Sequence, residues 1–364
     1  MEIYTDTLIE HTIFIPYDEQ LIIRDCTVKI ERNAHIICLG KFEASNVNFE
    51  PIEDTFGAIA IMSYNKESKI SQCIFKKGSG IPRKHFQKLP IFWEIFPLED
   101  WEYNDNEETR HTILKTKIAG ALICIDTKID HYTFEDCHSE DCGGSLYAIR
   151  STIKNSNFIN SHSKGDCGAI CGKESNIIRC SFIDCIADDS GGALGRYDLK
   201  IDDCFFIRCH AKEDGGAIFC SEQGSIHHSK FINCTARSGG AIAGTSHVSH
   251  CIFKNCSAKD RGGAIELYSR VACISDSKFM NCYVINKDAP SDVIFCCCGV
   301  TFIMDCMFKN TQESCKVFIY GCSFKVFWSK FTSKCQLQKP IDGCCEIKVM
   351  ACSYNSKNVI WKNI

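Results

Sequence analysis

A repeat of 24 residues is the feature that most restricts how this chain can fold. Similar phrases recur along it, among them "FIDCIADDSGGAL" from Phe182, "FIRCHAKEDGGAI" from Phe206 and "FINCTARSGGAI" from Phe231. The last glycine of each phrase, or its equivalent, stands at Gly120, Gly144, Gly168, Gly192, Gly216, Gly240 and Gly263. The successive intervals are 24 residues, and the final one is 23. A fixed period of about 20–50 residues indicates a solenoid, a propeller or an array. The length of 364 residues therefore counts repeats and not separate domains.

One repeat contains short strands and turns. The stretch from Ile201 to Phe206 is rich in strand formers, and Cys204 and Phe206, two residues apart, would share one strand face. Asn or Asp follows most of the phenylalanines by two residues and suits a turn, and a second short strand is expected at Ala217–Cys220. The paired glycines between them suit positive φ or a close backbone approach. Because no stretch has a sustained period of 3.6 residues, we predict an all-β parallel β-helix of about 11 or 12 coils.

Stacked coils place like residues above one another. Parallel strands lie about 4.8 Å apart, so one interior stack is predicted for Phe134, Phe158, Phe182, Phe206, Phe231 and Phe253. Three residues further on, the chain carries only Cys or Ser: Cys137, Ser161, Cys185, Cys209, Cys234, Cys256 and Cys282. These positions predict a tight corner that admits only small side chains.

The repeat resembles that of a known family. The pattern F-x-x-[C/S]-x-[A/S]-x-x-x-G-G-A-[I/L] is similar to the FxxN and GGA[I/L/V] repeats of chlamydial polymorphic outer membrane proteins, closely over residues 120–285 and more weakly over 45–77 and 286–335. Most coils carry Cys where the family has Asn. The resemblance implies a single-stranded right-handed parallel β-helix and a role in adhesion at a cell surface.

The repeat also divides the chain. We expect an N-terminal cap with irregular coils over 1–44, the β-helix over 45–335, and a degenerate C-terminal coil or cap over 336–364. An insertion at 78–114 interrupts the repeat, and a loop of this length is usually functional or disordered. Its aromatic side chains are the residues expected to bind a partner, unless they pack on the flank of the helix: Phe92, Trp93, Phe96, Trp101 and Tyr103.

Composition limits partners and location. A net charge of −4 and a pI near 6.3 give no basic footprint for nucleic acid. The longest low-charge apolar run, "VIFCCCGVTFIM", is shorter than the roughly 20 residues of a membrane span, so no transmembrane segment is expected. The first residues, "MEIYTDTLIEHTIFIPYDEQ", lack the pattern of a signal peptide, so we expect neither a secretion signal nor an autotransporter barrel. The resemblance favours a cell surface, whereas these features leave a cytoplasmic location open.

The 28 cysteines allow three interpretations. They can be core or corner thiols, disulfides, or metal ligands. The recurrent spacing C-x4-C, as in Cys180/Cys185 and Cys204/Cys209, follows the coil and not a ligand cage, so we favour thiols and expect no metal or other cofactor. The run "CCC" at 296–298 cannot bury all three side chains on one face, so we expect one of them to be exposed.

Two functional classes remain. The acidic loop before the glycines can line a groove for Ca²⁺ or a sugar, or it can be a solvated turn: Asp141, Asp166, Asp189, Glu213, Asp214 and Asp260. Arg237 and Arg261 interrupt that series, and no hydrolase signature appears. We therefore favour a non-enzymatic scaffold for adhesion or for a protein or glycan partner. The alternative is a carbohydrate-active β-helix enzyme resembling pectate lyases or polygalacturonases, in which acids from adjacent coils would converge on an open groove.

Overall fold

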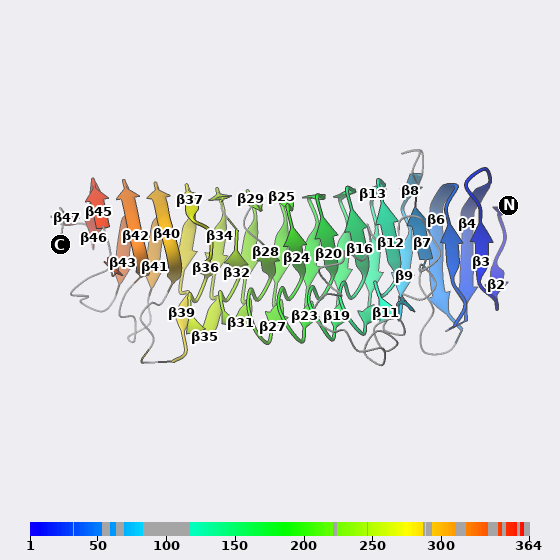
Figure 1. Cartoon of the computed structure of the whole chain (residues 1–364), viewed down its shortest axis with the longest axis horizontal. Coiled ribbons are helices and arrows are strands. Elements are labelled where there is room, and N and C mark those ends of the chain that lie inside the picture. The colour runs from blue at the N-terminus through cyan, green and yellow to red at the C-terminus, as the bar shows by residue number, and fades with distance from the viewer. Residues whose placement is uncertain are drawn as a thin grey trace, which may run out of the picture.

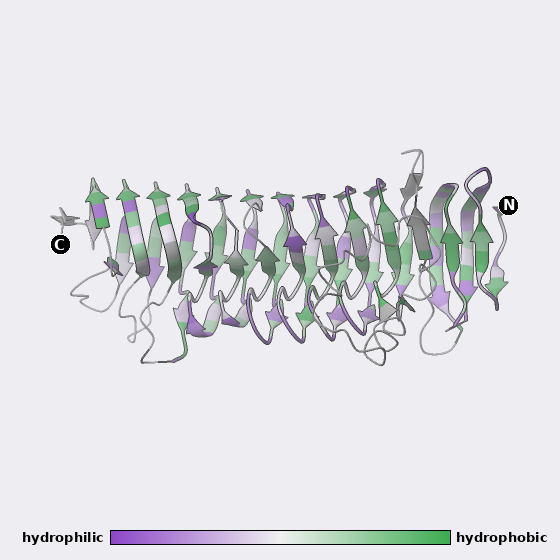
Figure 2. Cartoon of the chain, in the orientation of Figure 1, coloured by the Kyte–Doolittle hydropathy of each residue, from purple (hydrophilic) through white to green (hydrophobic). Residues whose placement is uncertain are grey.

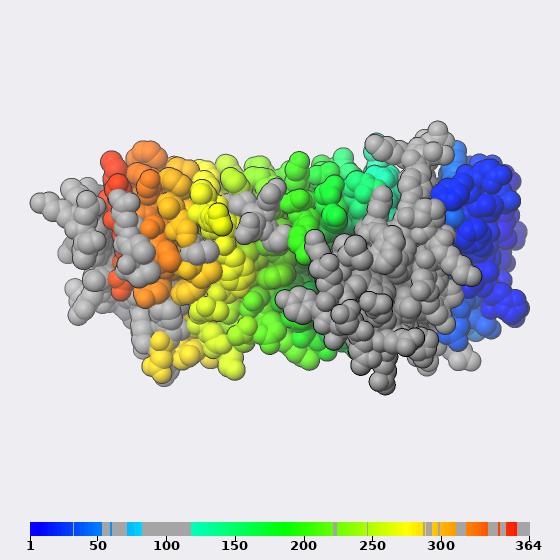
Figure 3. Space-filling view, viewed as in Figure 1, coloured from blue at the N-terminus to red at the C-terminus, as the bar shows by residue number. Residues whose placement is uncertain are grey.

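The chain forms one long stack of parallel strands, with the two termini at opposite ends of a rod (Figures 1 and 3). The computed structural model describes residues 1–31, 33–52, 59–62, 69–82, 117–220, 224–245, 247–286, 288, 293–310, 318–333, 341–343, 347–354 and 357–359. These residues contain strands and no helix. The prediction of a single-stranded right-handed parallel β-helix with 24-residue spacing is confirmed.

Each coil contributes three strands to three parallel columns. The first column contains β3 (Ile13–Ile15), β5 (Ile36–Cys38), β7 (Ile59–Met62), β12 (Leu122–Ile125), β16 (Leu146–Ile149), β20 (Ile170–Lys173), β24 (Leu194–Tyr197), β28 (Ile218–Cys220), β32 (Ile242–Gly244), β36 (Ile265–Leu267), the start of β40 (Ile294–Met304), the start of β42 (Ile319–Phe327) and β44 (Ile341–Gly343). The second column contains β1 (Glu2–Ile3), the starts of β4 (Gln20–Ile30) and β6 (Lys41–Pro51), β8 (Lys69–Ser71), β13 (Lys128–Asp130), β17 (Thr152–Lys154), β21 (Asn176–Ile178), β25 (Lys200–Asp202), β29 (Ser225–His227), β33 (His247–Ser249), β37 (Val271–Ser275), the ends of β40 and β42, and β45 (Ile347–Met350).

The third column runs beside them. It contains β2 (Thr7–Ile9), the ends of β4 and β6, β9 (Ile74–Lys76), β14 (Thr133–Glu135), β18 (Asn157–Ile159), β22 (Ser181–Ile183), β26 (Phe205–Ile207), β30 (Lys230–Ile232), β34 (Ile252–Lys254), β38 (Lys278–Met280), β41 (Met307–Asn310), β43 (Lys330–Ser333) and β46 (Cys352–Tyr354), on which β47 (Lys357–Val359) pairs antiparallel. A shorter fourth column contains β15 (His138–Ser139), β19 (His162–Ser163), β23 (Ile186–Ala187), β27 (His210–Ala211), β31 (Thr235–Ser238), β35 (Ser257–Arg261) and β39 (Tyr283–Val284). Parallel pairing therefore already begins at β1.

Turns with a left-handed residue separate the second and third strands. The expected strand from Ile201 to Phe206 is divided, because Asp203 has φ 51° and ends β25 before β26 begins. Cys204 lies at the resulting corner, where it is as buried as Phe206. The predicted turn after the phenylalanines is confirmed, as at Asn160, where φ is 51°. Figure 2 shows hydrophobic and hydrophilic positions alternating along individual strands, as expected when one strand face points inward.

The phenylalanines form the predicted interior stack. Neighbouring rings lie 4.8–4.9 Å apart between Phe134 and Phe253, with nearly parallel planes. The same stack continues beyond the predicted residues at both ends, to Phe49, Phe75, Phe279, Phe308 and Phe331. Offset stacking of this kind contributes roughly 0.5–1.5 kcal/mol per pair beyond burial.

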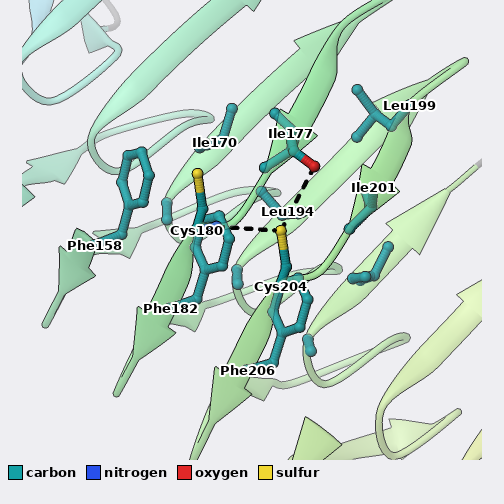
Figure 4. Close-up of a cluster of buried hydrophobic side chains, with 14 of the residues drawn as sticks. Phe158, Ile170, Ile177, Cys180, Phe182, Leu194, Leu199, Ile201, Cys204 and Phe206 are labelled. Atoms are coloured by element: carbon teal, nitrogen blue, oxygen red, sulfur yellow. Dashed lines mark hydrogen bonds between the residues drawn. The ribbon is translucent and has the colours of Figure 1, made fainter. Parts of the chain in front are cut away.

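Corner cysteines link one coil to the next. The Cys180 backbone N–H points at Cys204 Sγ, 3.4 Å away, and the Cys204 thiol donates to the Ile177 carbonyl at 3.5 Å (Figure 4). In another coil the Ser156 hydroxyl accepts the N–H of Tyr132 in the same way. Because a thiol and a hydroxyl can make the same contacts, Cys and Ser exchange freely at this corner. Cys297 is exposed, as expected for one residue of the "CCC" run.

The paired glycines serve two different purposes. Gly215 has φ +67°, a left-handed conformation that favours glycine. Gly216 has no such angle, but a Cβ atom there would overlap the Gly240 carbonyl oxygen and lie 2.5 Å from the Thr235 oxygen. The second glycine is therefore needed because the backbone of the next coil lies directly against it.

Candidate functional site

The described residues at the two ends of the insertion are buried against the solenoid. The aromatic residues predicted to bind a partner lie outside the described residues: Phe92, Trp93, Phe96, Trp101 and Tyr103. At the described ends of the insertion, β10 (Ile81–Pro82) pairs antiparallel with β11 (Lys117–Ile118). Ile81 and Ile118 are fully buried in a second apolar cluster that includes Ile123 and Tyr147 on the first column. This part of the outer face is thus covered and not free for a ligand.

The acidic loop residues mainly stabilise neighbouring turns. Asp141 and Asp189 stand two coils apart at corresponding places, with Gly165 between them, and Asp166 lies one position further along the loop. The Asp166 carboxylate accepts the Ser190 backbone N–H at 3.1 Å. Burial raises the pKa of Asp166, and the nearby Asp189 and Asp141 carboxylates raise it further. These acids therefore lie close enough to interact, and Asp166 binds the backbone of the next coil.

Further along the same loop, carboxyl groups from different coils do converge. The Tyr268 hydroxyl lies 3.0 Å from Asp214 Oδ2 and 3.0 Å from Glu266 Oε2, so these two oxygens are within about 6 Å of each other. Asp214 precedes β28, whereas Glu266 lies on β36, two coils away along the first column. We call Asp214, Glu266 and Tyr268 the carboxyl–phenol cluster.

The carboxyl–phenol cluster has one hydroxyl for two carboxyl groups. A phenol has one proton and can donate to only one of the two carboxyl groups. Burial raises the pKa of Glu266, whose side chain is 0% exposed, and burial together with the adjacent carboxyl groups raises the pKa of Tyr268. The Tyr268 hydroxyl lies between two acceptors, Asp214 Oδ2 and Glu266 Oε2.

Two arginines lie against the carboxyl groups of the cluster. Arg237 Nε lies 2.6 Å from Glu213 Oε2, and its guanidinium reaches Asp214 Oδ1 at 3.6 Å. Arg261 Nε lies 3.3 Å from Glu266 Oε1, and its guanidinium lies over the Phe295 ring. The two carboxyl groups have a separation comparable to that of a glycosidase pair. Glu266, however, has no exposed surface through which a sugar could reach it, whereas the Asp214 side chain is 21% exposed.

Sequence reasoning found part of this cluster. It singled out Asp214, Arg237 and Arg261 in the loop but missed Glu266 and Tyr268, which lie on or just after β36. A signal was present: Glu266 pairs with Ala243 and Phe295 in a column position that is otherwise apolar or small nearby. A single charged residue at a repeated apolar or small position is the signal by which Glu266 could have been found in the sequence.

The carboxyl–phenol cluster predicts a pH-dependent stability. The raised pKa of Glu266 means that the folded chain holds this proton more tightly than the unfolded chain, where the pKa is about 4.3. The resulting stabilisation is fully present below the unfolded pKa and is lost as the pH rises through the folded pKa. Glu266→Gln, which is neutral at every pH, should gain stability relative to wild type as the pH rises above about 4.3, the pKa of the unfolded chain. Urea denaturation of both proteins across this range measures the difference; a difference that does not change with pH would contradict the assignment.

A second polar feature lies on the N-terminal coils. An open groove of about 270 Å³ is lined by polar residues that include Asp6 and the left-handed turn residues Asp25, Asn46 and Gln72. The Asn46 amide donates to Asp25 Oδ1 at 3.0 Å, and Asp6 accepts the Thr27 N–H at 2.8 Å. Such amide and carboxylate groups can bind sugar hydroxyls, although the groove is small compared with ligand pockets of about 300–1,000 Å³.

Neither a metal centre nor a membrane span emerges from the described part of the chain. Within it, no three His, Cys, Asp or Glu side chains are placed to hold a metal ion. Nor does it contain a helix that is long and apolar enough to cross a bilayer.

Comparison with known proteins identifies the architecture of the chain but not its family. No protein-family model matches it, and no curated protein matches it in sequence. The fold and its regular columns define a right-handed parallel β-helix repeat protein. The comparisons do not confirm the resemblance to the chlamydial repeat family.

Three solved structures are similar over most of the chain. PfbA, a surface adhesin of Streptococcus pneumoniae, is 11% identical with a TM-score of 0.36, over 97% of this chain and 81% of that one. The A-module of the mannuronan C-5 epimerase AlgE4 of Azotobacter vinelandii is 9% identical with a TM-score of 0.35, over 94% and 91%. A family 28 exopolygalacturonase of Yersinia enterocolitica is 7% identical with a TM-score of 0.31, over 98% and 73%. Likenesses of this size do not identify a substrate or a partner.

Proposed function

We propose that this chain is a non-enzymatic binding solenoid that holds a protein or a glycan against the outside of its stacked coils. The observation that supports this proposal is the closed state of the carboxyl–phenol cluster. Glu266 is fully buried, Tyr268 bridges it to Asp214, and Arg261 lies against its remaining oxygen. Groups held in this way join neighbouring coils but do not offer a paired acid and base to a substrate.

The second candidate is a carbohydrate-active β-helix enzyme. The observation in its favour is the separation of the Asp214 and Glu266 oxygens, within about 6 Å, which lies in the range used by glycoside hydrolases. For this candidate Glu266 would have to become accessible when a substrate binds. The aromatic residues of the insertion stay a predicted partner site in either case.

Turnover and binding distinguish the two candidates. The purified protein is incubated with a panel of neutral and uronic polysaccharides, and new reducing ends and unsaturated products are measured alongside binding to the same immobilised polymers. We expect binding without bond cleavage, and we expect Asp214→Asn to bind as well as wild type once its folding is checked by circular dichroism. Cleavage by the wild-type protein that disappears in folded Asp214→Asn would overturn the proposal in favour of the enzyme.

A further inference from the structure

Five exposed lysines form a regular stripe on the C-terminal half of the third column. They lie on β30, β34, β38, β41 and β43, one on each successive coil. We call these residues the lysine stripe: Lys230, Lys254, Lys278, Lys309 and Lys330. From β14 to β26 the outward positions of this column carry no lysine, and Thr133, Asn157 and Ser181 are examples of the residues found there. On this column the lysines therefore follow one another without a gap only from β30 to β43.

The register makes the lysine stripe a zigzag. Lys230, Lys278 and Lys330 precede the buried phenylalanine of their strands, whereas Lys254 and Lys309 follow it. Successive lysines therefore alternate between two parallel rows, and each step along the rod is one coil, about 4.8 Å. Within one row the spacing is twice that distance.

Apolar side chains fill the places between the lysines. Lys230 pairs in register with Ile252, and Lys278 pairs with Ile252 on one side and Met307 on the other. Met280 similarly lies between Lys254 and Lys309. An ammonium group thus alternates with an apolar side chain both along the rod axis and across the two rows.

The ammonium groups are available to a ligand. Among the described residues none of the five lysines makes an ion pair. The Lys230 ammonium group lies over the Phe205 ring, 4.9 Å from its centroid. Asp276 and Asp305 lie in the turns that precede Lys278 and Met307. Asp276 is itself within 4.0 Å of His250. The outward positions of β30, β34, β38, β41 and β43 carry five lysines and no Asp or Glu, so these strands present a basic face on a chain whose net charge is −4.

This pattern fits an extended anionic polysaccharide. In a β-1,4-linked polyuronate each sugar carries one carboxylate, successive carboxylates alternate between the two sides of a ribbon, and one sugar is about as long as one coil. The apolar C–H faces of the rings would lie on Ile252, Met280 and Met307 while the carboxylates reach the lysines. Nucleic acid fits less well, because its single strands bind aromatic stacking platforms and its duplexes bind domains with a pI above about 9.

We propose that the lysine stripe is a binding site for a linear polyuronate that lies along the axis of the solenoid. This inference rests on the proposed function and gives it a ligand class and a face. The carboxylates pair with ammonium groups on alternate sides, so affinity should grow with ligand length and fall as salt is added.

A matched pair of ligands and a matched pair of variants test it. The ligands are cellohexaose and its fully C6-oxidised hexauronate, which differ only in the carboxylates. The variants are Lys278→Glu/Lys309→Glu in the stripe and Lys128→Glu/Lys200→Glu on exposed positions of the second column, which change the net charge equally. By titration calorimetry we expect wild type and the second-column variant to bind the hexauronate and not cellohexaose. The stripe variant should bind at least about tenfold more weakly, which corresponds to about 1.4 kcal/mol.

Each contrary result has its own meaning. Equal affinity of the stripe and second-column variants, tighter binding of single-stranded DNA than of the hexauronate, or no hexauronate binding at all would overturn the inference. The proposed function would still stand if the protein bound other glycans or a protein without cleaving them. Cleavage of the hexauronate by wild type would overturn the proposed function, whereas loss of binding in the stripe variant would still support this face as the ligand site.

Discussion

Phe206→Ala is expected to lower the free energy of unfolding by about 3–5 kcal/mol. The Phe206 ring is 0% exposed and stacks on Phe182 at 4.9 Å and on Phe231 at 4.8 Å, so its removal leaves a cavity in the middle of the phenylalanine stack. The neighbouring coils cannot close this cavity, because their separation is fixed by backbone hydrogen bonds on every column. Equilibrium denaturation in guanidinium chloride measures the loss.

The adjacent residue supplies the control. Phe205 is 38% exposed and points to the other side of β26, so Phe205→Ala should cost less than about 1 kcal/mol although the same side chain is removed. Similar losses for the two variants would mean that the rings do not form the interior of the solenoid.

The phenylalanine stack and its spacing could be predicted from the sequence because a parallel β-helix copies sequence period directly into structure. Each coil rests on the next in register, so a residue repeated every 24 positions must lie above its copy, as Phe158 does on Phe182. The ladder of small residues three positions after the phenylalanines follows from the same logic. Two of its members, Cys185 and Cys209, are fully buried.

The carboxyl–phenol cluster and the lysine stripe could not be predicted in this way. The cluster depends on residues that do not repeat, and the lysines of the stripe alternate between the two sides of the repeated phenylalanine, so neither keeps one fixed position in the repeat. Glu266 and Asp214 are 52 residues apart in the sequence but meet at Tyr268, because the chain turns twice between them. Similarly, Lys254 and Lys309 look unrelated until their coils are aligned with those of Lys278.

The role of the second glycine was only partly predicted. Sequence reasoning offered positive φ or a close backbone approach for the pair as a whole. The structure divides these roles, with the positive φ at Gly215 and the close approach at Gly216. The two causes cannot be separated from sequence, because both select glycine.

Gly216→Ala is expected to destabilise the fold strongly although it adds only one methyl group. The added Cβ would overlap the Gly240 carbonyl oxygen and lie 2.5 Å from the Thr235 oxygen, and both atoms belong to the backbone of the next coil. Backbone that is hydrogen-bonded on three columns cannot shift locally, so two coils must separate. We expect a loss of more than about 4 kcal/mol, or no folded protein, which is the range of exceptional single substitutions.

Gly172→Ala is the matched comparison. The Cβ at this position would come closest to Leu199 Cδ2 at 2.8 Å, the flexible end of a side chain, with the nearest backbone oxygen 3.8 Å away at Ala148. The leucine can move to another rotamer, so the expected loss is no more than about 1–3 kcal/mol.

The central claim is that the recurring glycine phrase is the unit from which the fold is built and not a repeated catalytic fingerprint. Equilibrium denaturation of Gly216→Ala beside Gly172→Ala tests it most directly, with circular dichroism to confirm the β structure of each folded protein. The claim predicts that Gly216→Ala is unfolded or loses more than about 4 kcal/mol, while Gly172→Ala stays folded. A Gly216→Ala protein as stable as wild type would contradict it.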